Sequence, residues 1–289
     1  MPVLDCAIVM LAHCGADFTR HNFNQLLGGA DLPREMFLVD NGSEDETASV
    51  FAEYIPRLRA AGIEVTTWRN EENKGCSLAR NEAWEKVTAP YTVLIDSDAC
   101  VCTKDWLSRF LAQFAERPTL GILGPKLLYP FQPHKIQCAG VSINPMGRVA
   151  FRGRAADRDD PRYAEHWPTW SLISACWMMR TELRESIGYL DELFHPVQYE
   201  DLDLCLRARL AGYEVAYTPE VEMYHFEGIT TASFGQDEYK ANIARNSLKF
   251  RGKWHHIFRF FPTDLPKDEY RWLRRAELGL RPELDLSYA

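Results

Sequence analysis

Short apolar segments and amphipathic segments alternate along residues 1–125 of this chain. The apolar runs have the length and composition of buried β-strands, and the segments between them repeat with the period of a helix. Strands are predicted at Ala7–Leu11, Met36–Asp40, Ile63–Trp68, Tyr91–Ile95 and Gly121–Leu123, and helices at Phe18–Leu27, Glu44–Ala60, Ser77–Lys86 and Asp105–Glu116. This alternation predicts an α/β fold in which a mainly parallel sheet has helices on both faces.

Polar side chains follow three of these predicted strands, namely His13, the turn 40–43, and the pair Asp96 and Asp98. In parallel sheets, ligands bind beyond the carboxyl ends of the strands. Burying an unpaired carboxylate costs roughly several kcal/mol, so the two aspartates predict an open sheet edge where a divalent cation or polar ligand compensates them. The alternative is a strand-to-loop turn in which both aspartates only cap the next helix.

Residues 126–235 follow a different pattern from the first part. The turn Asn144–Gly147 between short apolar runs predicts a hairpin, and the charged stretch 152–168 predicts a mobile loop. Trp170–Met179 predicts a buried strand, and Asp201–Leu210 predicts a helix that stops at Gly212. Without a repeat or a clear linker, we expect one catalytic domain, residues 1–235, with a nucleotide-binding part (1–125) and an acceptor-binding part (126–235).

Composition excludes several classes of protein. The formal net charge of −8 argues against a general nucleic-acid binder. No apolar segment approaches the ~20 residues of a membrane-spanning helix, and the N-terminal apolar run has no basic lead. Eight cysteines without CxxC spacing are typical of reduced thiols, so a cytoplasmic location is expected.

The turn Asp40–Ser43 combines two signals. An ionised aspartate only accepts hydrogen bonds, so Asp40 could accept the N3–H of uracil or thymine, whereas cytosine lacks that donor. The alternative is ordinary turn chemistry, because all four residue types favour turns. Ser43 and Glu46 are also spaced as a capping box, which predicts that the Ser43 side chain caps the following helix.

A glycine precedes the helix predicted after residue 76. The helix N-terminus at Gly75, with Lys74 and Arg80 nearby, could hold an anionic diphosphate. The alternative is a glycine-led helix start with two solvated cations.

Glu200, Asp201 and Asp203 lie at or near a predicted helix N-terminus, which stabilises negative charge. This position predicts a lowered carboxylate pKa and therefore a weak but reliably ionised base; the alternative is favourable capping charge alone. His225 follows another apolar run and could ligate a metal with Asp98, although a lone histidine is more often structural.

In their order and spacing, these motifs resemble those of family-2 glycosyltransferases of the GT-A fold, most closely the bacterial rhamnosyltransferase-like branch. The resemblance spans residues 6–228. It is carried by Val39–Thr47, Asn73–Gly75 with Ala79–Asn81, Asp96–Asp98, Ile187–Phe194, Tyr199–Arg207 and His225.

The resemblance implies a role for each matching residue. For the donor it implies base recognition by Asp40 and contacts to base, phosphates, ribose or sugar from Leu11, Ala12, His13, Asn73, Lys74, Gly75, Arg80, Asp96 and Ser97. It implies that Asp98 and His225 ligate Mn²⁺ or Mg²⁺, that Asp201 is the catalytic base, and that Glu200 orients a substrate. Trp170 and Trp177, which precede this acidic pair, are expected to form an acceptor platform or to be ordinary core aromatics.

The function expected from the resemblance is inverting transfer of a sugar from a UDP- or dTDP-type donor to a hydroxyl, with a bacterial glycan or glycolipid as acceptor. One alternative is a phosphatase with an aspartyl nucleophile, which Leu94–Asp98 superficially suits. Another is a nucleotide-sugar-binding protein without catalysis.

A C-terminal helical extension is expected over residues 236–289. Its stretch 245–275 contains nine Lys or Arg against three Asp or Glu and is interleaved with aromatic residues. Such a surface could lie on an anionic membrane, at the inner face of which the protein would be peripheral. The alternative, which we favour, is a helix that packs on the catalytic domain.

Overall fold

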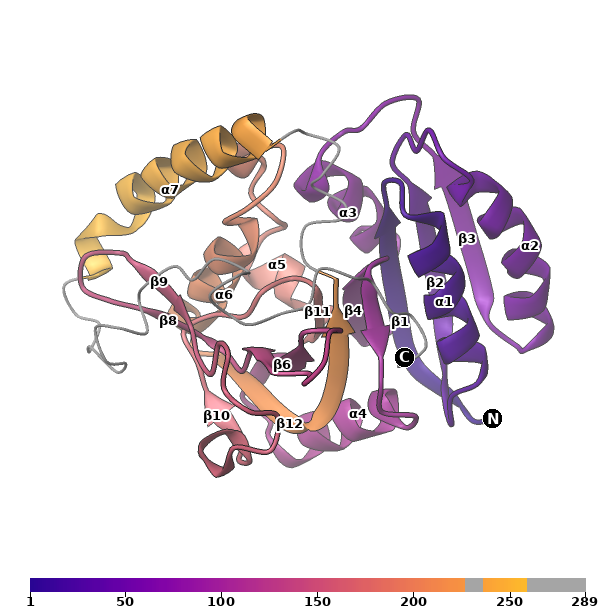
Figure 1. The fold of residues 1–289 in the computed structure, drawn as a ribbon, viewed down its shortest axis with the longest axis horizontal. Helices are drawn as coiled ribbons and strands as arrows, with labels where there is room; N and C mark the ends of the chain where they lie inside the picture. The colour runs from indigo at the N-terminus through magenta and orange to yellow at the C-terminus, as the bar shows by residue number, and fades with distance from the viewer. Residues whose placement is uncertain (227–235, 259–289) are drawn as a thin grey trace.

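A computed structural model describes residues 1–226 and 236–258 of the chain. Its ten-stranded sheet runs in the order β10-β12-β6-β11-β4-β1-β2-β3, with β5 paired to β12 and β7 paired to β6 (Figure 1). The strands are β1 (Val3–Ala12), β2 (Leu32–Asp40), β3 (Glu64–Arg69), β4 (Tyr91–Asp96), β5 (Ala99–Val101), β6 (Leu120–Leu128), β7 (Ile136–Cys138), β10 (Trp167–Pro168), β11 (Cys176–Arg180) and β12 (Glu214–His225). A separate antiparallel hairpin consists of β8 (Val141–Ile143) and β9 (Val149–Phe151).

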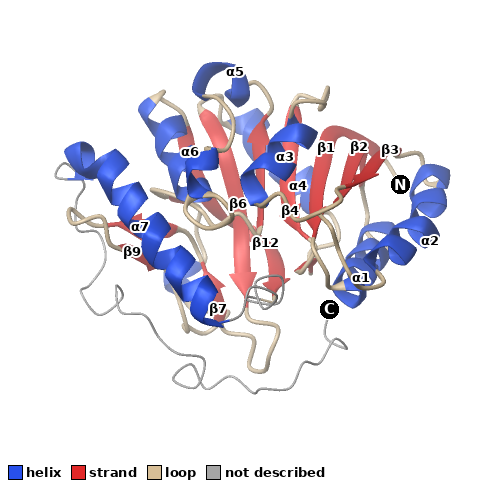
Figure 2. Cartoon of the chain, turned by 90° about the horizontal axis from the view of Figure 1, so that it is seen from above, coloured by secondary structure: helices blue, strands red, loops and turns tan. Residues whose placement is uncertain are grey.

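Helices cover both faces of the sheet, as predicted (Figure 2). They are α1 (Ala16–Leu27), α2 (Thr47–Ala60), α3 (Cys76–Trp84), α4 (Trp106–Glu116), α5 (Leu183–Ile187), α6 (Glu200–Leu210) and α7 (Gln236–Phe258), with short 3₁₀ turns at Pro161–Tyr163 and Glu192–Phe194. One apolar layer buries side chains of α1, α2 and α4, and the other buries side chains of α3 and α5. The expected α/β fold is therefore confirmed.

The strands predicted in the first part of the chain are confirmed, as are its four helices. Strands β4, β1, β2 and β3 pair in parallel. Strand β11 runs antiparallel to both of its neighbours, β4 and β6, and so joins this parallel half to the parallel pair of β6 and β12. The sheet is consequently mixed.

The predicted capping box is wrong. Helix α2 begins after Glu46 without a side-chain cap from Ser43. The Ser43 hydroxyl instead accepts a hydrogen bond from the Cys14 backbone N–H at 2.9 Å. Asp45 accepts the backbone N–H of Thr47 at 3.0 Å, so its carboxylate serves the start of the helix.

In the second part, the hairpin at Asn144–Gly147 and helix α6 are confirmed, whereas the predicted strand Trp170–Met179 is regular only over β11. The loop 152–168 is fastened to the domain, because the Tyr217 hydroxyl donates to the Tyr163 carbonyl oxygen at 2.7 Å and the Lys126 ammonium donates to the Arg158 carbonyl oxygen at 3.2 Å.

Helix α7 packs on the rest of the fold through Phe250, Trp254 and Phe258, which are all buried. For residues 245–258, the favoured alternative of a helix packed on the domain is therefore confirmed. The side chains of Trp254 and Phe258 are buried and cannot contact a membrane in this arrangement. The rest of the stretch, 259–275, lies outside the described residues. No helix in the described ranges combines the length and apolar character needed to cross a bilayer.

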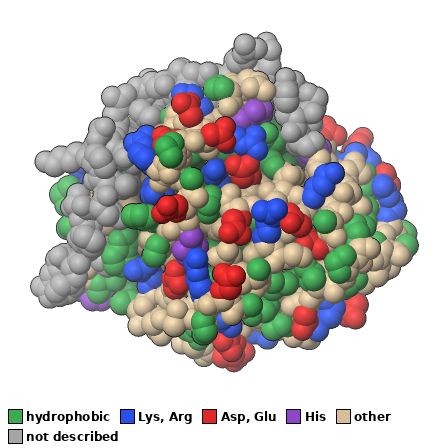
Figure 3. Space-filling view, turned by 90° about the horizontal axis from the view of Figure 1, so that it is seen from below, with side chains coloured by type: hydrophobic (Ala, Val, Ile, Leu, Met, Phe, Trp, Pro, Cys, Tyr) green, Lys and Arg blue, Asp and Glu red, His purple; other side chains and the backbone are tan. Residues whose placement is uncertain are grey.

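Acidic, basic and apolar side chains are interspersed on the molecular face shown in Figure 3. The coloured residues of this face form no extended positive surface, which agrees with the net charge of −8.

Candidate functional site

A cavity of about 570 Å³ lies at the carboxyl ends of β1, β2 and β4. Strand β12, the turn before α6, the β8–β9 hairpin and α7 complete its wall. Ten of the residues predicted for the site line it: Leu11, His13, Asn73, Gly75, Arg80, Asp96, Asp98, Glu200, Asp201 and His225.

The strand register explains why distant motifs meet. Leu11 of β1 lies opposite Asp96 of β4, and Ala12 lies opposite Asp40 of β2. Because these strands are parallel, their carboxyl ends form one edge, and the polar residues that follow them converge there.

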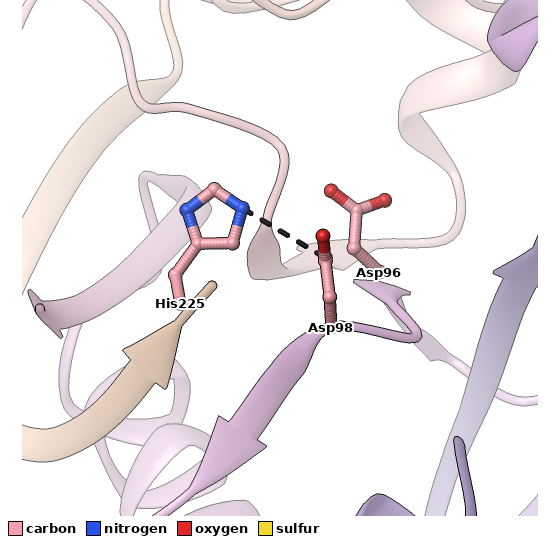
Figure 4. A group of neighbouring side chains, drawn as sticks. All are labelled: Asp96, Asp98 and His225. Atoms are coloured by element: carbon pink, nitrogen blue, oxygen red, sulfur yellow. Dashed lines mark ion pairs between the residues drawn. The ribbon is translucent and has the colours of Figure 1, made fainter. Parts of the chain in front are cut away.

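Asp96, Asp98 and His225 form a compact group of metal-binding side chains (Figure 4). One ligand atom from each lies within 4.8 Å of the others, and His225 Nε2 is 3.8 Å from Asp98 Oδ1. The pairing of β5 with β12 brings His225 opposite Ala99, next to Asp98 in the chain. Two carboxylates and an imidazole are donors that suit Mn²⁺ or Mg²⁺, so this group fits the expected metal.

Gln137, which the sequence analysis missed, fixes the orientation of His225. Its Oε1 lies 2.7 Å from His225 Nδ1, and its Nε2 donates to the His225 carbonyl oxygen at 3.3 Å. Since the Gln137 amide nitrogen donates to the carbonyl oxygen, the amide oxygen must accept a hydrogen bond from the Nδ1–H of His225. The Nε2 lone pair is thereby left facing Asp98, ready to bind a cation.

Arg80 is fully buried in the floor of the cavity. It forms an ion pair with Asp96, and its Nη1 donates to the Ser174 hydroxyl at 3.1 Å. Burial opposes the charged form, but the nearby Cys76, Asp96 and Glu200 groups outweigh it and raise the pKa of Arg80. This cation therefore holds the acidic groups of the floor together.

Glu200 and Asp201 enter the cavity from the first turn of α6. Gln198 and Tyr199, just before them, both adopt left-handed backbone conformations, with φ of 82° and 80°. Such conformations are costly for residues with side chains and persist only where surrounding contacts enforce them. The turn thereby aims both carboxylates at the cavity.

The predicted lowering of the carboxylate pKa is wrong for Glu200 and Asp201. Burial raises the pKa of Glu200, with a further rise from Asp201, and Arg80 only partly opposes it. Burial likewise raises the pKa of Asp201, although its carboxylate accepts the backbone N–H of Leu202 at 2.8 Å and that of Ser174 at 3.3 Å. Desolvation outweighs the helix N-terminus here.

Helix α7 holds the strained turn in place, a role that the sequence did not reveal. The Asn246 side chain, fully buried, donates to the carbonyl oxygens of Phe194, Val197 and Gln198 at 2.7–3.1 Å. Tyr239 of α7 accepts a hydrogen bond from the Gln198 side chain at 3.0 Å.

A second anchor joins α7 to α6. The buried Asp203 carboxylate accepts from the Trp254 indole at 2.9 Å and pairs with Lys253 at 2.6 Å. Its other oxygen accepts from Arg207 at 2.8 Å. Asp203 therefore stabilises the packing of α7 on α6 through three partners, and it does not line the cavity.

Asp40 is buried and does not line the cavity, whereas its neighbour Asn41 does. Asp40 Oδ1 accepts the Ser43 backbone N–H at 2.9 Å, and Arg69 lies 3.5 Å from its other oxygen. The Asn41 side chain donates a hydrogen bond to Asn73 and accepts one from Asn70, both at 2.9 Å. It therefore joins the end of β2 to the loop before α3.

Gly75 is required by a close approach. With φ of 79°, a Cβ atom there would lie 2.6 Å from the His195 ring. This contact lets the Cys76 N–H donate to the Pro196 carbonyl at 2.7 Å, joining α3 to the turn before α6. Lys74 does not line the cavity, because its ammonium pairs with Glu82 at 2.9 Å.

The expected acceptor platform of Trp170 and Trp177 is wrong. Trp177 is fully buried in the core and has no face to offer a ligand. Trp170 lies outside the cavity wall with the Arg209 guanidinium 4.3 Å from its ring centre. Ala12 and Ser97 are also buried and contribute no lining.

The family model for glycosyl transferase family 2 matches residues 7–188. The O-antigen biosynthesis protein RfbC of Myxococcus xanthus is 30% identical over 222 residues, which are 73% of this chain and 16% of RfbC. This chain thus spans about a sixth of the length of that curated relative.

Two solved structures share the fold. GalNAc-T7 with UDP, GalNAc and Mn²⁺ has a TM-score of 0.62 and 15% identity, over 76% of this chain and 43% of that one. The mannosyltransferase PcManGT from Pyrobaculum calidifontis, in complex with GDP-Man and Mn²⁺, has a TM-score of 0.58 and 17% identity, over 88% and 70%. At these identities the likeness concerns the GT-A fold alone. The family match ends at residue 188, before Glu200, Asp201 and His225 in the chain.

Proposed function

This chain belongs to glycosyltransferase family 2, and we propose that it transfers one sugar from a nucleoside diphosphate sugar to a hydroxyl group with inversion at the anomeric carbon. The observation that carries this proposal is that one cavity holds two groups of functional side chains. The metal-binding type of group consists of Asp96, Asp98 and His225, and the second group is the carboxylate pair Glu200 and Asp201.

The donor is proposed to occupy the cavity end formed by β1, β2 and β4. Leu11, His13 and Asn41 line this end, and Asn41 holds the backbone of the loop that leads to Gly75. A UDP or dTDP carrier is proposed, with Asp40 as the base-recognising residue of the family. In this structure Asp40 lies behind Asn41, so its role requires that the base reach past the cavity wall.

Asp98 and His225 are proposed to hold Mn²⁺ or Mg²⁺, in support of which both solved structures named above contain Mn²⁺. A cation there would supply charge neutralisation for the departing diphosphate. Asp96, held by Arg80, is proposed to contact the ribose or the donor sugar.

Asp201 is proposed as the base that removes the acceptor proton while the acceptor oxygen attacks the anomeric carbon from the opposite face. A single displacement needs one base and no carboxylate nucleophile. The raised pKa of Asp201 makes its carboxylate a stronger proton acceptor than an ordinary aspartate. Glu200, buried beside it, is proposed to orient substrate.

The acceptor is proposed to be a glycan or glycolipid that enters between the β8–β9 hairpin and α7. These elements complete the wall of the same cavity with Val149, Phe151 and Ile243. The acceptor-binding part would then include α7 as well as residues 126–235. The family match gives no support to the alternative of an aspartyl phosphatase.

The Asp201→Asn variant tests the proposal. Transfer should fall by about 10²–10⁴-fold, the usual contribution of a general base, while UDP and Mn²⁺ binding stays within about twofold of the wild type. Transfer is followed with radiolabelled donor and binding by calorimetry. Full transfer by the variant would remove Asp201 from the mechanism, and donor binding without any turnover by the wild type would favour a non-catalytic binding protein.

A further inference from the structure

The four acidic residues that line the cavity all lie near its catalytic end: Asp96, Asp98, Glu200 and Asp201. The charged residues that line the wall formed by the β8–β9 hairpin and α7 are all positively charged. These are Arg148 just before β9, Arg154 shortly after it, and Arg251 on α7. The acidic groups of the cavity wall therefore come from the end of β4 and the start of α6, whereas the charged groups on the side of the hairpin and α7 are all basic.

Arg148 and Arg251 come together through the packing of the hairpin tip on α7. At Gly147, with φ of 70°, a Cβ atom would lie 2.5 Å from the Phe258 ring and 2.9 Å from the Arg251 side chain. Only glycine permits this approach, which sets Arg148 beside the stem of Arg251. Figure 1 shows the hairpin reaching α7 on the side of the molecule away from β1, β2 and β3.

Both guanidinium groups are exposed to the cavity mouth, and within residues 1–226 and 236–258 neither forms an ion pair. Arg80, the cation at the opposite end, is committed to Asp96. Arg148 and Arg251 are thus available to a ligand, whereas Arg80 is not.

A guanidinium carries five N–H donors and no acceptor. A neutral glycan offers hydroxyls that need acceptors as well as donors, which these side chains cannot supply. A carboxylate or phosphate offers only acceptors, and its two oxygens match the guanidinium fork. We propose that Arg148 and Arg251 form a subsite for an anionic group of the acceptor glycan, a carboxylate or phosphate a short distance from the reacting hydroxyl.

This inference rests on the proposed function, because it assigns the hairpin end to the acceptor. The test uses the full chain with UDP and Mg²⁺ held at saturation, so that the donor end is occupied. Trigalacturonate and maltotriose, an anionic and a neutral trisaccharide of equal length, are titrated by calorimetry against the wild type and the double variant Arg148→Gln/Arg251→Gln.

The wild type should bind trigalacturonate about tenfold more tightly than maltotriose, since two partly exposed ion pairs contribute about 1.4 kcal/mol together. The double variant should bind the two sugars equally. The matched control Arg57→Gln/Arg245→Gln removes two exposed arginines that do not line the cavity, and it should keep the preference.

Equal binding of both sugars by the wild type, or an unchanged preference in the double variant, would overturn the subsite. A weaker UDP affinity in the double variant would also overturn it, by assigning the arginines to the donor diphosphate. Binding to phosphatidylglycerol vesicles but not to trigalacturonate would replace the glycan by a lipid surface. Because UDP binding is measured separately, its complete absence would instead count against the proposed function.

Discussion

Asp201 shows how strongly local burial determines the chemistry of a single side chain. Its place in the first turn of α6 is evident from the sequence, and that place alone favours a lowered pKa. The pKa of Asp201 is raised instead, because its carboxylate is buried in the cavity floor beside Glu200. Desolvation depends on the tertiary surroundings, which no local pattern contains.

The pH dependence of transfer follows from this shift. Burial raises the pKa of Asp201 to about 6, although backbone N–H groups and Arg80 oppose the rise. A base must be ionised, so kcat should fall about tenfold per pH unit as the pH drops below about 6 and level off above it. Initial rates between about pH 5 and pH 8 check this. UDP binding at each pH is the control, and a flat profile would contradict it.

Gln137 gives a second prediction at this scale. Gln137→Met keeps the volume but removes both hydrogen bonds to His225, so the imidazole should lose its fixed tautomer. Affinity for Mn²⁺ should fall about 10–100-fold, the usual effect of losing a partner of a metal-binding histidine. Calorimetry with Mn²⁺ measures the affinity, and ¹⁵N NMR of the His225 ring reports the tautomer without metal.

The matched control is Gln113→Met, which removes another buried glutamine, bonded to Glu220 and not part of the cavity wall. It should leave Mn²⁺ affinity and the His225 spectrum unchanged. An Nδ1-protonated ring that persists in Gln137→Met would show that other contacts set the tautomer.

At the scale of elements, the first half was predictable because each strand and helix has its own hydrophobic period. The direction of β11 was not, since an apolar run looks the same in parallel and antiparallel pairing. The sequence likewise favoured a C-terminal helix packed on the domain, but it did not reveal that this helix supports the turn before α6, because Asn246 reaches carbonyl oxygens about fifty residues earlier in the chain.

The docking of α7 can be tested with Asn246→Ala. Loss of its buried hydrogen bonds should lower the free energy of unfolding by about 1–3 kcal/mol. It should also lower kcat with little change in UDP affinity, because the turn that aims Glu200 and Asp201 loses its support. Urea denaturation and steady-state kinetics give both quantities.

Asn242→Ala is the comparison variant, since Asn242 is buried in the same helix and, among residues 1–226 and 236–258, its side chain bonds only to Arg245 of that helix. It should lower stability without the loss of kcat. Equal kinetic effects in the two variants would reduce Asn246 to a purely structural residue.

At the scale of the molecule, the order of motifs identified the family and the GT-A fold, because a doubly covered parallel sheet collects its strand ends at one edge. Which residues form the opposite wall was not predictable. The tryptophans expected there are elsewhere, and the hairpin and α7 supply the wall instead. Such packing depends on contacts between segments with no sequence signature in common.

Ligand binding should therefore stabilise the whole fold. UDP with Mn²⁺ at about 100 times the dissociation constant adds about 2.7 kcal/mol to the free energy of unfolding, which raises Tm by several degrees. Asp98→Ala should lose the part of the rise that depends on Mn²⁺, because it removes one of the three clustered donors. Thermal denaturation with and without Mn²⁺ measures both effects, and an equal rise in the variant would exclude Asp98 as a ligand.

The anchoring of the catalytic turn by Asn246 also bears on the chain as it is synthesised. On the proposed roles, a nascent chain of 188 residues already contains the donor edge but has no base, no His225 and no support for the turn. Assembly of the reaction centre therefore waits for α7 to leave the ribosome and dock. Until then the turn that carries the proposed base lacks the hydrogen bonds that hold it, so the growing polypeptide has no complete reaction centre.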